Sequence, residues 1–112
     1  YYPDGQGSIR LAAGSVARFI QRALTTYGRP KAPLFLGKPH LPIFHTAHQR
    51  LEQVAGGVIE KNRVLMIGDN LDSDVAGATA FGYRTAVVLT GITTPAMLAA
   101  SQLKPDWVWR GL

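Results

Sequence analysis

The feature that most constrains the fold of this chain is a short apolar run that leads directly into a glycine and a cluster of aspartates. The run covers residues 64–67, and the residues of interest after it are Gly68, Asp69, Asp72 and Asp74. A short, continuous run of β-forming residues predicts a buried strand of a parallel sheet. Small residues then predict a helix that ends at Gly82, a glycine suited to the position after a helix C-terminus. The aspartates therefore lie at the carboxyl end of a strand, the edge where open α/β sheets bind ligands.

The three aspartates of this loop allow two interpretations. The chain has seven acidic residues in total, and crowding Asp69, Asp72 and Asp74 into one loop is costly by like-charge repulsion unless a cation lies among them. Mg²⁺ is the natural candidate, because it is a hard ion that takes oxygen ligands and keeps several waters. The alternative is an ordinary helix start, since aspartates suit the N-cap and the first turn of a helix. The loop alone leaves both interpretations open.

Further apolar runs and amphipathic patterns alternate along the rest of the chain. They predict strands at residues 33–36, 84–89 and 106–109, and helices at residues 15–27, 42–55 and 95–101. This alternation predicts an α/β domain, with a three-layer, Rossmann-like parallel sheet and helices on both faces. We expect residues 14–112 to form this domain and residues 1–13, which contain Pro3 and two glycines, to be a linker.

A second chemically suggestive segment, Gly37-Lys38-Pro39, follows the strand predicted at residues 33–36. Gly37 allows the backbone to approach a ligand closely, and Pro39 biases Lys38 toward an extended conformation. A lysine held at the carboxyl end of a strand predicts an ammonium group that binds an anion. The alternative is a lysine in a solvated loop, which is the usual state of an isolated lysine.

Composition and charge exclude several classes of function. The 112 residues include no cysteine, which excludes disulfides and thiolate metal sites and fits a reducing cytoplasm. The net charge of +5 favours the binding of anionic small molecules. The chain has no dense basic run of the kind that would indicate nucleic-acid binding. No apolar run approaches the ~20 residues that span a bilayer. His40, His45 and His48 lack the accompanying ligands of a metal site. We therefore expect a cytoplasmic protein that binds neither nucleic acid nor membrane.

Taken together, the two segments resemble the third and fourth motifs of the haloacid dehalogenase (HAD) superfamily. They are Gly37-Lys38-Pro39 and Gly68-Asp69-x-x-x-x-Asp74. Further segments resemble the NagD/4-nitrophenylphosphatase-like subfamily in the same order, namely Phe44, the Leu-Thr-Gly-Ile-Thr-Thr run at 89–94, and Pro105-Asp106. Near the start, Pro3-Asp4 and Ala13-Gly14-Ser15 resemble the return from the cap to the core of that subfamily. The chain is thus similar to the C-terminal core portion of these proteins, with residues 1–13 as the end of the cap.

The resemblance implies a Mg²⁺-dependent phosphatase that acts on a small phosphorylated metabolite through an aspartyl-phosphate intermediate. It implies that Lys38, together with Gly37, holds the phosphoryl group, and that Asp69 binds Mg²⁺ directly or through water. Asp74 would support both the metal site and the lysine, so that Lys38, Asp69 and Asp74 form the catalytic set. These roles agree with phosphoryl transfer, which depends mainly on positioning and on charge stabilisation.

The chain also departs from the family pattern. The family's nucleophile and general acid/base lie in an Asp-x-Asp-Gly segment, which this sequence does not contain, and the phosphate-binding Ser or Thr of the second motif has no identifiable counterpart. The chain begins at Tyr1 rather than at Met, so we expect either a processed product or a piece of a longer protein. Without the strand that carries the nucleophile, apolar faces and strand edges would be exposed. This predicts a homo-oligomer or a partner chain that supplies the missing strand.

Three other functions stay open. One is a non-catalytic phosphate- or metal-binding module, made as a short chain or as a partner subunit, that keeps Lys38 and the acidic loop but performs no turnover. A generic nucleotide-binding α/β domain is disfavoured, since no G-x-G-x-x-G follows a predicted strand. The last is a structural remnant without a ligand, whose thermal stability neither Mg²⁺ nor phosphate would change.

Overall fold

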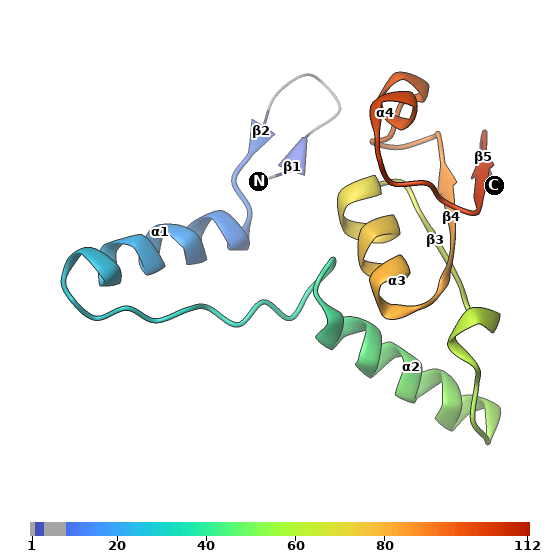
Figure 1. Ribbon diagram of the computed structural model, residues 1–112, viewed down its shortest axis with the longest axis horizontal. Helices are drawn as coiled ribbons and strands as arrows, with labels where there is room; N and C mark the ends of the chain where they lie inside the picture. Colours follow the sequence, from blue (N-terminus) through green and yellow to red (C-terminus); the bar gives the residue numbers. More distant parts are fainter. Residues whose placement is uncertain (1, 4–8) are drawn as a thin grey trace. The chain divides into compact units, whose positions relative to one another are not determined.

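The computed structural model of this chain describes residues 2–3 and 9–112. The chain divides into two compact units, Tyr1–Phe35 and Leu36–Leu112. Each unit has its own secondary structure (Figure 1).

The first unit contains a short strand pair and one long helix. Strands β1 (Tyr2–Pro3) and β2 (Ile9–Arg10) pair antiparallel, and helix α1 spans Ala13–Thr26. This helix confirms the one predicted at residues 15–27 and begins slightly earlier in the chain. The two short strands lie in the segment expected to be a linker, whereas Asp4 of the predicted cap-to-core segment lies outside the described residues.

The second unit contains a three-stranded parallel sheet with helices between its strands. The strands lie in the order β3 (Leu65–Gly68), β4 (Arg84–Val88) and β5 (Trp107–Trp109). The helices are α2 (Leu41–Ala55), α3 (Ala76–Phe81) and α4 (Pro95–Ala100), with a 3₁₀ turn η1 (Lys61–Arg63) and a π-helical turn η2 (Leu71–Val75). The α/β class is thereby confirmed, and the strands agree with the predicted ones to within one residue at each end. In the part of the chain that the structure describes, no helix is both long and apolar enough to cross a membrane.

The prediction of a strand at residues 33–36 is wrong. These residues belong to no helix or strand, and Leu34 and Leu36 are 79% and 59% exposed. A strand forms when a neighbour takes up its backbone hydrogen bonds, and among the described residues β3 pairs only with β4. The apolar composition of the run indicated burial, but composition does not supply a pairing partner.

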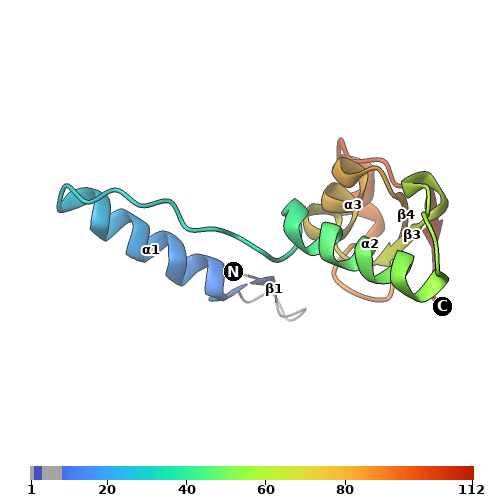
Figure 2. The same cartoon turned by 90° about the horizontal axis from the view of Figure 1, so that it is seen from below.

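The core of the second unit consists of two clusters of apolar side chains. The first joins α2 and α3 to the sheet and contains Phe44, Ala78, Phe81 and Tyr83, against which Val64 and Met66 pack. The second contains Leu71, Val75 and Val87, with Leu98 and Leu103 packed against them. Figure 2 shows α2 beside α3, where the rings of Phe44 and Phe81 stack with centroids 5.9 Å apart. This packing fixes the N-terminal end of α2 against the helix that follows the acidic loop.

Helix ends in the second unit follow local sequence signals. Helix α3 ends at Gly82, which has a positive φ of 99° and donates its N–H to the carbonyl oxygen of Ala78. The helix end predicted at Gly82 is therefore confirmed. Helix α4 begins with Pro95, and the Thr94 hydroxyl oxygen accepts the Met97 N–H at 3.2 Å.

Asp106 joins β5 to β4. Its Oδ2 accepts the Thr85 N–H at 2.8 Å, and its Oδ1 accepts a hydrogen bond from Arg84 Nη1 at 2.7 Å. These contacts hold the pKa of the Asp106 carboxyl below its ordinary value, chiefly through the Thr85 N–H and then through Arg84. The Pro105-Asp106 segment therefore contributes to sheet assembly.

Candidate functional site

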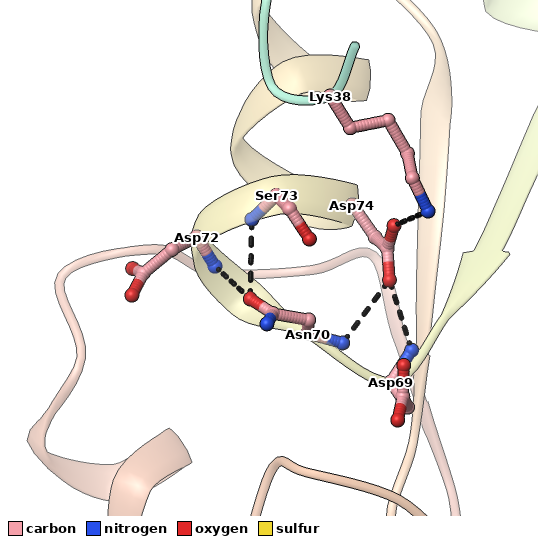
Figure 3. Close-up of polar contacts among 6 residues, drawn as sticks. All are labelled: Lys38, Asp69, Asn70, Asp72, Ser73 and Asp74. Carbon is pink, nitrogen blue, oxygen red and sulfur yellow. Dashed lines mark hydrogen bonds and ion pairs between the residues drawn. The ribbon is translucent and has the colours of Figure 1, made fainter. Parts of the chain in front are cut away.

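The loop after β3 is shaped by Asn70. Its side-chain oxygen accepts the N–H groups of Asp72 and Ser73 at 2.9 and 3.2 Å, which caps the start of η2. Asp72 lies in the first turn of η2, which agrees with the prediction that it is a helix-start residue. Its carboxylate points away from Asp74 (Figure 3). Asn70 was not predicted as a cap from the sequence, although asparagine is among the preferred capping residues.

Asp74 is the centre of the polar network drawn in Figure 3. Its side chain is only 4% exposed, and its Oδ1 accepts a hydrogen bond from Lys38 Nζ at 2.6 Å. Its Oδ2 accepts the backbone N–H groups of Asp69 and Asn70, each at 3.2 Å. A buried carboxylate is costly unless such partners satisfy it. The network therefore holds the lysine and the acidic loop in one arrangement.

Two glycines allow this close packing. A Cβ atom at Gly68 would overlap the carboxylate of Asp74. A Cβ atom at Gly77 would lie 2.6 Å from the ring of Phe44 and 2.8 Å from the carbonyl oxygen of Pro39, both far shorter than ordinary contacts. The absence of side chains at these positions lets the segment before α2 approach α3.

Lys38 lies just before α2, and its peptide bond to Pro39 is cis. Its side chain is 46% exposed even though its ammonium group binds Asp74. An ammonium group has three donors, so Lys38 can bind an anion and keep its hydrogen bond to Asp74. A Cβ atom at Gly37 would have nothing within 4 Å, and the close approach of this glycine to a ligand stays a prediction.

Asp69 lies at the carboxyl end of β3, half-buried beside the loop that follows β4. Its Oδ2 accepts the Ile92 N–H at 3.1 Å, and its backbone carbonyl oxygen accepts the Thr93 N–H at 2.9 Å. Its Oδ1 accepts no hydrogen bond from the residues that the structure describes. Neither contact was predicted from the sequence, although Ile92 and Thr93 belong to the run at 89–94 that carried part of the family resemblance.

The histidines of α2 lie in a separate cluster. His48 Nδ1 is 3.0 Å from the Tyr83 hydroxyl, and its Nε2 is 3.5 Å from a carboxylate oxygen of Glu52. His45 contacts the ring of Phe81 edge-on. Burial, and secondarily the charge of Glu52, raises the pKa of Tyr83.

The donor atoms at the end of β3 fit one part of a site for Mg²⁺. Asp69 offers one carboxylate oxygen, whereas Lys38 and backbone N–H groups already occupy both oxygens of Asp74. The described residues contain no group of three or more histidines or carboxylates that could hold a metal. Mg²⁺ usually keeps several waters and takes one or two protein carboxylates together with phosphate oxygens. Asp69 therefore suits the role of a direct Mg²⁺ ligand, and Asp74 suits the role of a residue that positions the loop carrying Asp69.

Fold and site together define a class of protein, a parallel α/β domain with a lysine–aspartate pair and an available carboxylate at the carboxyl edge of its sheet. A family model described as HAD-hydrolase-like matches residues 35–112. The chain therefore belongs to the HAD superfamily of hydrolases, and the resemblance found in the sequence is confirmed.

Several of the similar proteins are named as phosphatases. The chain is 32% identical over 82 residues to an acid sugar phosphatase of Staphylococcus haemolyticus, an alignment that covers 73% of this chain and 29% of that protein. It is 33% identical to a 4-nitrophenylphosphatase structure from Thermotoga maritima, with a TM-score of 0.69 and coverage of 88% and 34%. NagD from Escherichia coli shares the fold, with a TM-score of 0.74 at 20% identity and coverage of 94% and 38%. The chain spans less than two-fifths of the length of each relative.

Proposed function

We propose that the complete protein containing this chain is a Mg²⁺-dependent phosphatase that hydrolyses a small phosphomonoester. This chain would form the C-terminal part of its catalytic core. The observation that carries the proposal is the Lys38–Asp74 pair, 2.6 Å apart, beside Asp69 at the carboxyl end of β3. The names of the relatives, an acid sugar phosphatase and a 4-nitrophenylphosphatase, support a phosphate ester as the substrate class.

Lys38, Asp74 and Asp69 each have a distinct role in this proposal. Lys38 binds the phosphoryl group, because its half-exposed ammonium has donors to spare beyond the one that Asp74 accepts. Asp74 fixes the lysine and the acidic loop, because its carboxylate is buried and contacts both. Asp69 would bind the cation through Oδ1, the oxygen that accepts no hydrogen bond from the described residues. Bound Mg²⁺ supplies charge stabilisation for the phosphoryl group.

The nucleophile of this reaction lies outside the set described above. Hydrolysis through an aspartyl-phosphate needs an unencumbered carboxylate, and both oxygens of Asp74 already accept hydrogen bonds. The 112 residues contain no Asp-x-Asp-Gly segment. We therefore expect the nucleophile to come from another part of the complete protein, and we expect no turnover by these 112 residues alone.

Two substitutions in the complete protein test these roles, with 4-nitrophenyl phosphate as the substrate. Lys38→Ala should lower kcat/KM by about 10²–10³-fold, the usual loss when one donor to a developing negative charge is removed. Asp69→Asn should abolish Mg²⁺-dependent turnover. Lys104→Ala and Asp72→Asn are matched controls, because both side chains are exposed and lie outside the network. Wild-type turnover in both Lys38→Ala and Asp69→Asn would refute the assigned roles.

A second candidate function is a non-catalytic phosphate- or metal-binding module, which would act as a short chain or as a subunit beside a partner. It is favoured by one observation: the Lys38–Asp74 pair and Asp69 are arranged within 112 residues that contain no Asp-x-Asp-Gly segment. Calorimetry of the 112-residue chain with Mg²⁺ and inorganic phosphate tests it. A folded chain that gives no heat with either would exclude this function.

A further inference from the structure

The loop between β4 and α4, which donates two hydrogen bonds to Asp69, has been given no function so far. Three neighbouring residues of this loop contact Asp69: Gly91 and Ile92 meet its side chain, and Thr93 meets its main chain. Asp69 therefore does not simply project from the end of β3. Its main chain and its side chain are both held by a segment more than twenty residues further along the chain.

Gly91 lies where no side chain fits. A Cβ atom built at this position would overlap an oxygen of the Asp69 carboxylate, and it would also lie 2.5 Å from the Cβ and Cγ atoms of Asp69. The aspartate thus packs directly on the backbone of the loop. Any larger residue at position 91 would force either the loop or the carboxylate to move.

The two residues after Gly91 fix the orientation of the aspartate. The Ile92 N–H binds Oδ2 at 3.1 Å, which turns this oxygen toward the loop. The Thr93 N–H binds the main-chain oxygen of Asp69 at 2.9 Å, and Thr93 itself is only 1% exposed, so that the loop is anchored in the core. One carboxylate oxygen, Oδ1, is left without a hydrogen bond from the described part of the chain.

We propose that Gly91–Thr93 is the positioning element of the cation site. It binds one oxygen of Asp69 and presents the other to Mg²⁺. This inference rests on the proposed function, because it takes Asp69 to be the Mg²⁺ ligand. Its specific consequence is that the affinity for Mg²⁺ depends on Gly91, a residue that offers the cation no side-chain donor.

Gly91→Ala in the complete protein tests the proposal. The variant should bind Mg²⁺ about 10–100-fold more weakly by calorimetry, the usual loss when a group that orients a metal ligand is altered. Gly57→Ala is the matched control, because a Cβ atom there would meet nothing within 4 Å and Gly57 has no positive φ. In an Asp69→Asn background, Gly91→Ala should have no further effect on Mg²⁺ affinity, since the ligand that it positions is gone.

The outcomes separate this proposal from the proposed function. If Asp69→Asn leaves Mg²⁺ affinity unchanged, Asp69 is not the ligand and the proposed function itself is wrong. If Asp69→Asn weakens Mg²⁺ binding but folded Gly91→Ala binds Mg²⁺ like the wild type, only the positioning role is refuted. An additive loss in the double variant would refute it as well, because it would show that Gly91 acts independently of Asp69.

A measurement on the unmodified protein covers the case in which Gly91→Ala does not fold. The amide N–H signals of Ile92 and Thr93 should shift in NMR spectra when Mg²⁺ is added, because both groups bind Asp69. The amide of Gly57 should not shift. Binding of Mg²⁺ without any change at Ile92 or Thr93 would overturn the proposal.

Discussion

Replacing Asp74 with asparagine tests the polar network directly, because the two side chains share a shape and differ in charge and in one donor group. In the native arrangement, one carboxylate oxygen faces the ammonium of Lys38 and the other faces the N–H groups of Asp69 and Asn70. Asparagine converts one of these oxygens into an NH₂ group. Whichever orientation the amide takes, a donor then faces a donor, so the native set of hydrogen bonds is no longer available.

The structure also indicates which orientation the Asp74→Asn side chain takes and what it costs. Lys38 is half-exposed and can turn to water, whereas the two backbone donors lie beside a buried side chain. The amide oxygen should therefore keep the backbone donors, and the bond to Lys38 should be lost. A hydrogen bond to a charged group contributes about 1.5–3 kcal/mol, so we expect a loss of this size in the free energy of unfolding. For a domain near this size the midpoint of thermal unfolding should fall by about 10 °C.

Urea denaturation of the 112-residue chain measures this change, with Trp107 and Trp109 of β5 as fluorescent probes. The dependence on urea concentration should keep its slope while its midpoint falls. Asp72→Asn is the control, since that exposed carboxylate lies outside the network. A loss below about 0.5 kcal/mol for Asp74→Asn, the range of ordinary surface substitutions, would show that the buried carboxylate does not hold Lys38 and the loop together.

Two further predictions concern pH. The Thr85 N–H, followed by Arg84, lowers the pKa of Asp106, so its contribution to stability is present above the ordinary aspartate pKa of about 3.9 and is lost as the pH falls through the lowered value. Asp106→Asn should therefore flatten the acid limb of a plot of unfolding midpoint against pH, and an unchanged limb would contradict this assignment. Burial and then Glu52 raise the pKa of Tyr83, so the contribution of Tyr83 is present below about pH 10 and is lost as the pH rises toward the raised value. Tyr83→Phe should remove that alkaline loss in the same measurement, and a variant that loses stability as steeply as the wild type would refute it.

The parts of the fold that could be predicted from the sequence are those that depend on the side chains of the residues that form them. The apolar run of β3, the amphipathic pattern of α2 and the glycine that ends α3 each act locally, and all three are found where they were expected. The prediction of a strand at residues 33–36 was wrong because strand formation does not depend on local composition alone. The composition of this run matches a strand, but a strand also needs a neighbouring backbone, and sequence composition carries no information about which neighbour is present.

In the candidate site, too, side-chain features could be predicted from the sequence and backbone contacts could not. Lys38, Asp69 and Asp74 were predicted from the sequence because their charged side chains follow expected strand ends, and the structure brings Lys38 to Asp74 across 36 positions of the chain. The Ile92 contact was missed because its donor is a backbone N–H, which every residue except proline possesses. The Asn70 cap carried a readable signal, but the neighbouring aspartates suited the same position.

The contact between Lys38 and Asp74 has a consequence for the entropy of ligand binding. A lysine side chain free in solvent samples many rotamers, and ordering it costs about 1.5–2 kcal/mol. In this protein the buried carboxylate of Asp74 already restricts the ammonium group when the chain folds. A phosphate that arrives at Lys38 would therefore meet a side chain whose disorder was lost beforehand, and more of the electrostatic attraction between them would remain as affinity.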